Sequence, residues 1–202
     1  MVAITRFIAL ESVSIADALT ATRIQLGVPK ARGIQIPVSN NPGSTTLAFY
    51  FRNDQGYSQQ AGGTVVDATA TLSSYLGYND TGAIAGVLSR YFIDGFDVSG
   101  YSSNVVLANT GTAKWQLFVI RFENIPRQAG LLNFFMDAAG NAPYPVKFAD
   151  VRLYDYALSI AQISAPLLPF DYVTRYTFAD YSPGDTVATD VSGNGNHGVV
   201  LL

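Results

Sequence analysis

Hydrophobic residues between Gly33 and Phe178 occur in short runs that alternate with polar residues or are wholly apolar. Runs of this length, separated by turn residues at regular spacing, predict the β-strands of a sandwich or barrel. The predicted strands are Gly33–Val38, Thr45–Arg52, Gly63–Leu72, Gly86–Phe92, Val105–Leu107, Lys114–Phe122, Leu131–Met136, Val146–Tyr154 and Arg175–Phe178.

The segments between these runs are rich in Asn, Asp, Gly, Ser and Pro. Such residues tolerate positive φ angles or hydrogen-bond to their own backbone, so they favour tight turns. The pair Asp94-Gly95 predicts a hairpin turn. The other turn clusters are Ser39–Ser44, Asn53–Gly56, Asn79–Gly82 and Asn109–Gly111.

Two segments depart from simple alternation. Trp115–Phe122 is apolar almost throughout until Arg121, which is typical of a strand buried on both faces at the centre of a sheet. Tyr154–Ile163 is the best helical segment. Ser159, with Gln162 three residues later, predicts a capping box at the start of a helical turn.

The composition changes what these strands imply about the surface. Apolar residues make up 49% of the 202 residues and charged residues only 13%, about half the usual ~25%. The chain holds only two Glu and three Lys. Because interface cores are poor in charge and rich in Tyr and Phe, this shortage indicates that part of the outside faces protein partners.

Charge and length exclude several classes of partner. A net charge of −3 gives no basic footprint for nucleic acid. No apolar stretch approaches the ~18–20 residues that cross a bilayer, so no membrane partner is predicted. The first twenty residues lack the basic and apolar regions of a secretory signal.

Candidate chemistry is sparse. There is no Cys and one His, which excludes disulfides, thiolate metal sites and clusters of imidazoles. Glycoside hydrolysis usually needs two flanking carboxylates, but neither Glu11 nor Glu123 has an acidic neighbour at strand spacing. Asp94 and Asp97 are interpreted as parts of a polar hairpin. The chain is therefore predicted not to be an enzyme.

Two motifs resemble a known family. Phe148-Ala-Asp-Val-Arg-Leu-Tyr-Asp-Tyr-Ala-Leu-Ser159 resembles the closing motif of laminin-G-like, concanavalin A-like domains. Tyr176–Asp180 followed by Asp190–Gly198 resembles the opening motif of the same family. The resemblance covers residues 33–202. It implies an all-β, two-sheet antiparallel jelly-roll sandwich with one short helix after the closing strand.

The order of the two motifs departs from the family, because the opening motif follows the closing one. Circular permutation explains this order, since domain termini often lie close together. Residues 33–202 then form a single sandwich, 170–202 supply its opening strands, and 1–32 form an N-terminal arm or extra strand. The alternative is that residues 170–202 begin a second domain.

The resemblance also suggests ligands. Domains of this family often hold Ca²⁺ through oxygen ligands, which Asp190, Asn194 and Asn196 offer. The alternative is that these residues bond the amides of their own turn. No other cofactor is predicted. The candidates for contact with a glycan or a protein partner lie in or near polar segments: Tyr57, Tyr75, Tyr78, Tyr91 and Tyr101.

No single site in the sequence predicts the function, so the function is inferred from the composition and from the family resemblance. The first hypothesis is a non-enzymatic virion component of a bacteriophage, made in the host cytoplasm: a capsid cement or decoration protein, or a tail or fibre accessory. Its partners would be further copies of the chain or capsid and tail proteins, and residues 1–32 and 164–175 its docking arms. The alternative is a carbohydrate-binding, lectin-like module of a secreted or cell-surface protein.

Overall fold

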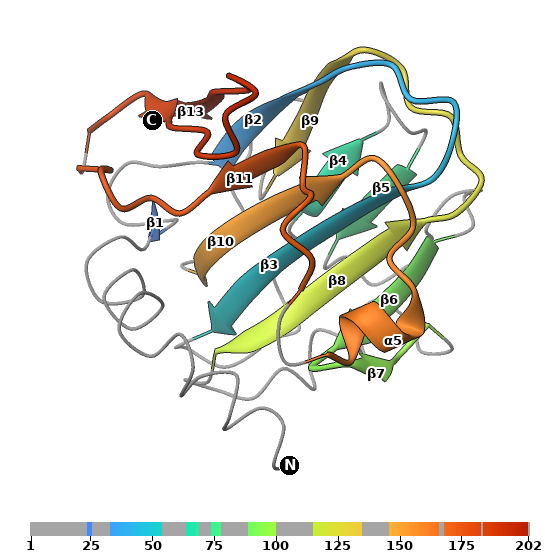
Figure 1. The fold of residues 1–202 in the computed structure, drawn as a ribbon. Helices are drawn as coiled ribbons and strands as arrows, with labels where there is room; N and C mark the ends of the chain where they lie inside the picture. Colours follow the sequence, from blue (N-terminus) through green and yellow to red (C-terminus); the bar gives the residue numbers. More distant parts are fainter. Residues whose placement is uncertain are drawn as a thin grey trace.

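The computed structural model describes residues 24–25, 33–53, 64–68, 74–77, 89–99, 115–134, 146–165, 168–182 and 184–201. These residues form two antiparallel sheets packed face to face, with one short helix (Figure 1). The all-β, two-sheet sandwich predicted from the strand spacing is confirmed.

The first sheet is built around β10, which has strands on both sides. One edge of β10 pairs with β3 along its length, and the other edge is shared by β1 and β11. A bulge between Ala149 and Arg152 lies between the parts of β10 that pair with β1 and with β11. The strand order is β1 (Ile24–Gln25), β10 (Val146–Tyr154), β3 (Thr45–Asn53), β8 (Gln116–Phe122), β6 (Ser89–Ile93) and β7 (Phe96–Asp97), with β11 (Thr174–Tyr176) beside β10.

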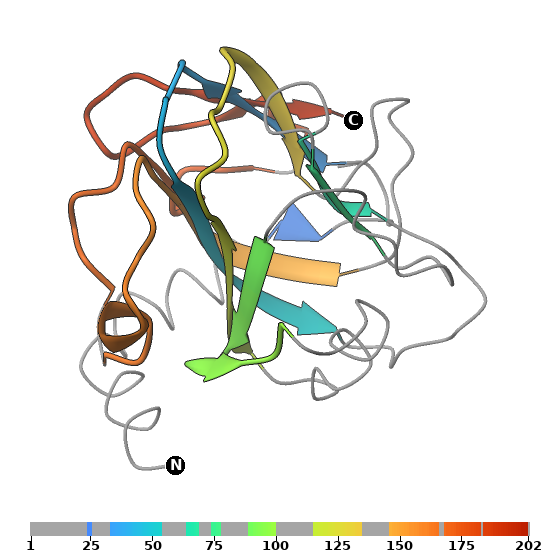
Figure 2. The same ribbon diagram turned by 90° about the vertical axis from the view of Figure 1, so that its right-hand side faces the viewer.

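The second sheet packs against one face of the first, as the side view in Figure 2 shows. Its strand order is β12 (Val187–Ala188), β13 (Gly198–Leu201), β2 (Gly33–Val38), β9 (Gly130–Phe134), β4 (Thr64–Ala68) and β5 (Ser74–Gly77). Residues 174–201 therefore contribute β11 to the first sheet and β12 and β13 to the second, within one sandwich.

Several predicted boundaries agree with the structure. Strands β2 and β10 begin and end where the sequence pattern predicts, and β8 lies between β3 and β6 at the centre of its sheet. The helix is shorter than predicted: α5 spans Ile160–Ile163, because β10 continues to Tyr154 and the residues between are not helical. The capping box of Ser159 and Gln162 is confirmed.

The core between the sheets follows the alternation of the strands. Ile34, Ile36 and Val38 of β2 point inward and meet Phe49 of β3 and its neighbours. Burial of these apolar side chains is the main stabilising term of the fold. Gly198 is also required here, since a Cβ would lie 2.9 Å from Ile34 Cγ2. The remaining buried members of this core are Leu47, Tyr91, Ile93, Phe118, Ile120, Phe122, Leu132, Phe134, Val151, Leu153, Tyr176, Phe178, Ala188 and Val200.

Candidate interaction surface

The outer face of the first sheet is covered by the chain itself. Residues 155–165 and 168–173, here called the strap, carry α5 and lie on the side of the first sheet away from the second (Figure 2). Leu168, predicted within a docking arm, is only 2% exposed, so for this residue the prediction is wrong. The side chains buried between strap and sheet are Ala48, Phe92, Val119, Tyr154, Leu158, Ile163 and Leu168.

Hydrogen bonds fix the strap to the strands beneath it. Thr46 Oγ1 donates to the carbonyl of Tyr156 (2.8 Å) and accepts from the Leu158 amide (3.0 Å). The Tyr154 hydroxyl donates to the carbonyl of Pro169 (2.9 Å). The buried guanidinium of Arg127 forms an ion pair with Asp155 (2.5 Å) at the start of the strap.

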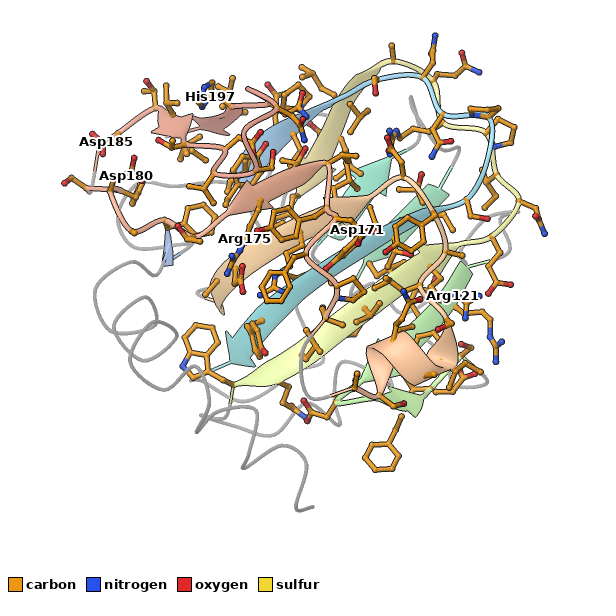
Figure 3. The ribbon with its side chains drawn as sticks, viewed as in Figure 1. Arg121, Asp171, Arg175, Asp180, Asp185 and His197 are labelled. Carbon is orange, nitrogen blue, oxygen red and sulfur yellow. The ribbon has the colours of Figure 1, made fainter. Side chains whose placement is uncertain are left out.

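A buried ionic cluster anchors the other end of the strap. Asp150 accepts from Arg152 (2.5 Å) and from Arg175 of β11 (2.7 Å), and both guanidinium groups lie over the ring of Tyr172. Arg175 lies over the first sheet in Figure 3. Asp150 has φ 47° at the bulge of β10, which turns its carboxylate toward the two arginines.

The two guanidinium groups explain why Asp150 is stable as a buried carboxylate. Burial alone would raise the pKa of Asp150, but Arg152 and Arg175, by charge and hydrogen bonding, hold it below its usual range. The carboxylate is thus ionised and fully engaged by its two partners. The cluster joins β10, β11 and the strap, and its geometry is that of a structural clamp.

The hairpin between β6 and β7 is also tied to the strap. Asp94 and Gly95 have φ 50° and 84°, which confirms the predicted Asp-Gly hairpin. The Asp94 carboxylate accepts from the Leu117 amide (2.9 Å), and Ser164 Oγ donates to the Gly95 carbonyl (3.3 Å). Asp97 accepts from Arg90 and Ser99, so both hairpin carboxylates are engaged in local hydrogen bonds.

The loop that contains Asp190 closes on itself through hydrogen bonds. Asp190 Oδ1 accepts from the amides of Arg175 and Ser192, both at 2.9 Å. Its Oδ2 accepts from Ser192 Oγ (2.8 Å) and from the Asn196 amide (2.9 Å). Burial acts to raise the pKa of Asp190, but these bonds outweigh it and lower the pKa.

The two asparagines of this loop turn their amide groups toward the backbone. Asn194 Nδ2 and Asn196 Nδ2 both donate to the carbonyl of Val173, at 3.0 and 2.9 Å. The Asp190 amide donates to His197 Nδ1 (3.2 Å). Within the described residues, no three Asp, Glu or His side chains gather to hold a metal ion. The geometry matches the hydrogen-bonded alternative, and calcium stays a prediction.

The outer face of the second sheet differs from that of the first, because no described segment lies over it. We call its outward-facing side chains on β12, β13, β2 and β9 the open face. Val187, Leu131 and Val199 are 52%, 44% and 43% exposed. No member of this set is charged. The set consists of Val187, Val199, Leu201, Gln35, Pro37, Leu131 and Asn133.

One row of the open face runs straight across the sheet. Val187 pairs with Val199, Val199 with Gln35, and Gln35 with Asn133, whose amides also bond side chain to side chain (Nε2 to Oδ1, 3.2 Å). The backbone register continues the row to Asp67 and Tyr75. From β12 to β9 the row consists of two valines and two amides, uncharged side chains of the kind found at the centre of protein interfaces.

The predicted contact tyrosines divide into two groups. Tyr91, predicted as a contact residue, is 4% exposed in the core beside Phe118, so this prediction is wrong. The sequence does not show which residues of β6 face the core, because Tyr91, Phe92 and Ile93 are all apolar. The register of β6 against β8 places Tyr91 inward. Tyr57, Tyr78 and Tyr101 lie outside the described residues, and Tyr75 is described only as part of the backbone of β5.

Comparisons with known proteins return no relatives: no family model matches the chain, and neither does a curated protein or a solved structure. Among the described residues, no helix has the length and apolar character needed to cross a membrane.

Proposed function

We propose that this protein is a non-enzymatic structural component of a larger assembly, which acts by packing its open face against protein subunits. The observation that carries the proposal is that face: an ordered sheet surface with exposed Val187, Val199 and Leu131 and no charged side chain in the set. Exposed apolar patches of this kind mark interaction sites on soluble proteins.

The pairing of the charged groups supports the same proposal. Arg90–Asp97, Arg121–Glu123 and the Asp150 cluster all belong to the first sheet and its surroundings. Among the described side chains, these charged pairs thus lie with the first sheet, and the four strands of the open face carry none. If the open face were in contact with water in the working protein, Lys or Glu on these strands would cost little stability. The absence of such residues from the open face therefore favours a face that is covered by a partner.

The assembly that the sequence favours is a bacteriophage virion, with the chain as a cement, decoration, tail or fibre protein. The fold proposed with it is a laminin-G-like, concanavalin A-like sandwich in which residues 170–202 supply the opening strands. The pairing of β11 with the first sheet and of β12 and β13 with the second is consistent with this proposal.

A second candidate function is glycan binding by the same face. The bonded amides of Gln35 and Asn133, flanked by exposed valines, offer donors and acceptors of the type that sugar hydroxyl groups use. Under this alternative, replacing Gln35 by Ala abolishes binding on a glycan array, whereas replacing exposed Ile160 of the strap by Lys leaves binding unchanged.

The test of the structural proposal is incorporation into particles. Virions are purified from cultures that produce the protein, and the chain is detected in the intact particle band. We expect wild-type chain in stoichiometric amount and loss of incorporation for the double variant Val199→Lys, Leu131→Lys. Ile160→Lys, at an exposed apolar position of the strap on the opposite side, is the control. A chain absent from purified particles contradicts the virion proposal.

A further inference from the structure

We propose that the first partner of the open face is a second copy of this chain, stacked through a twofold axis so that the two second sheets lie face to face. This inference rests on the proposed function, because it names the partner of the same surface. It is carried by the chemistry of the amide row, by the absence of charge and by the difference between the two outer faces of the sandwich.

The amide row is complementary to itself. Gln35 donates to Asn133, which leaves the side-chain oxygen of Gln35 as an acceptor and the amide nitrogen of Asn133 as a donor. A twofold axis that passes between them sets Gln35 of one copy opposite Asn133 of the other. Each remaining acceptor then faces a donor, as an isologous interface requires.

Charge does not oppose this pairing across the described side chains. The open face carries no Lys, Arg, Asp or Glu side chain among them, so two identical faces meet without like-charge repulsion. A binding surface usually discriminates between different partner proteins through a complementary pattern of charges. The side chains of the open face carry no such pattern.

The strap determines the size of the assembly. Residues 155–165 and 168–173 bury the outer face of the first sheet, although Ile160 and Phe170 of the strap are themselves exposed, so among the described residues only the second sheet has a face free to pair sheet to sheet. Two open faces would allow copies to stack without end, but a single self-complementary face closes after two copies. The expected species is a dimer of four stacked sheets.

The area of the open face determines how strongly the two copies are expected to associate. The four strands of the open face, about 4.8 Å apart and about five residues long, give a flat area of about 300 Å². A stable interface usually buries about 800 Å² on each partner. The dimer is therefore expected to be weak and to populate with rising protein concentration.

Sedimentation velocity on the purified full chain tests this inference. We expect the average mass to rise from that of the monomer toward twice that value as concentration increases. Gln35→Lys and Asn133→Lys, each of which brings two like charges together next to the twofold axis, keep the chain monomeric. Ile160→Lys on the strap leaves the concentration dependence unchanged, and far-ultraviolet circular dichroism verifies that every variant is folded.

Footprinting separates failure of this inference from failure of the proposed function. The reactivity of Val199 and Leu131 toward hydroxyl radicals is compared between the isolated chain and purified particles. A chain that stays monomeric, but whose open face is protected in particles, overturns the twofold pairing and supports packing on another protein. A monomeric chain whose open face reacts equally in particles overturns both. Dimerisation that survives Gln35→Lys and Asn133→Lys places the contact elsewhere and also overturns the inference.

Discussion

The two outer faces of this sandwich are built from similar strands but have opposite surroundings. On the first sheet, Val119 and Phe92 are buried under the strap. On the second sheet, Val199 and Val187 hold comparable outward positions and are exposed. Outward apolar side chains are therefore normal for this chain, and what distinguishes the two faces is whether a segment of the same chain covers them.

The charged residues follow the same division. Under and around the strap, charges are paired: Arg127 with Asp155, and Asp150 with two arginines. At the far end of the molecule, Asp180, Asp185 and His197 lie in the loops around β12 and β13 (Figure 3). The side chains of the open face are those of valines, leucines, a proline, a glutamine and an asparagine. Among the described side chains, paired charges thus accompany the covered face, and the four strands of the open face carry no charge.

The largest effect is expected from removing the clamp of the covered face. Asp150→Asn leaves the buried guanidinium of Arg152 without its counter-charge, and an unpaired buried charge costs about 3–5 kcal/mol. Urea unfolding measures the loss. Asp97→Asn, which breaks the more exposed pair with Arg90, is the control and is expected to cost less than about 1 kcal/mol. Equal losses in the two variants would show that the cluster does not anchor the strap.

A leucine pair compares the two faces directly. Leu168→Ala removes a side chain buried between strap and sheet, and is expected to lower the free energy of unfolding by about 2–4 kcal/mol. Leu131→Ala makes the same chemical change on the open face, where the expected loss is below about 1 kcal/mol. Thermal unfolding of both variants in one buffer checks the difference. A small loss for Leu168→Ala would mean that the strap covers the sheet without stabilising it.

Alkaline pH is expected to weaken the covered face. Burial raises the pKa of Tyr154 from 10.0 to about 12, and its hydroxyl donates to the carbonyl of Pro169 in the strap. The unfolded chain loses this proton first, so the contribution is present below pH 10 and is lost as pH rises to about 12. The loss is about 3 kcal/mol, at ~1.4 kcal/mol for each pKa unit. Urea unfolding across this range measures it, and Tyr154→Phe is expected to reduce the pH dependence by that amount.

Much of the sandwich was predictable from local pattern. Strands β2 and β10 end where alternation stops, and the Asp94-Gly95 turn and the Ser159 cap each depend on neighbours in sequence. The apolar outward positions of β8 correctly indicated a strand buried on both faces. Local pattern is sufficient where the interacting residues are close in sequence.

Other features depend on contacts that no local pattern contains. The pattern of β8 indicates that a segment covers it but not which segment, so the sequence alone predicts Leu168 in a docking arm. The side chain of Asp150 meets Arg175 across 25 residues, and only the bulge at φ 47° turns it toward that partner. The inward phase of Tyr91 depends on register with β8, since its neighbours are apolar as well.

The smallest stability effect is expected on the open face itself, and a valine pair isolates it. Val199→Thr keeps the shape of an exposed side chain, so the free energy of unfolding is expected to change by less than about 0.5 kcal/mol. Val119→Thr places the same hydroxyl group under the strap, where burial without a partner costs about 1–3 kcal/mol. Urea unfolding of both variants gives the difference. A loss at Val199 as large as that at Val119 would mean that the open face is buried within the monomer, and the contrast between the two faces would then disappear.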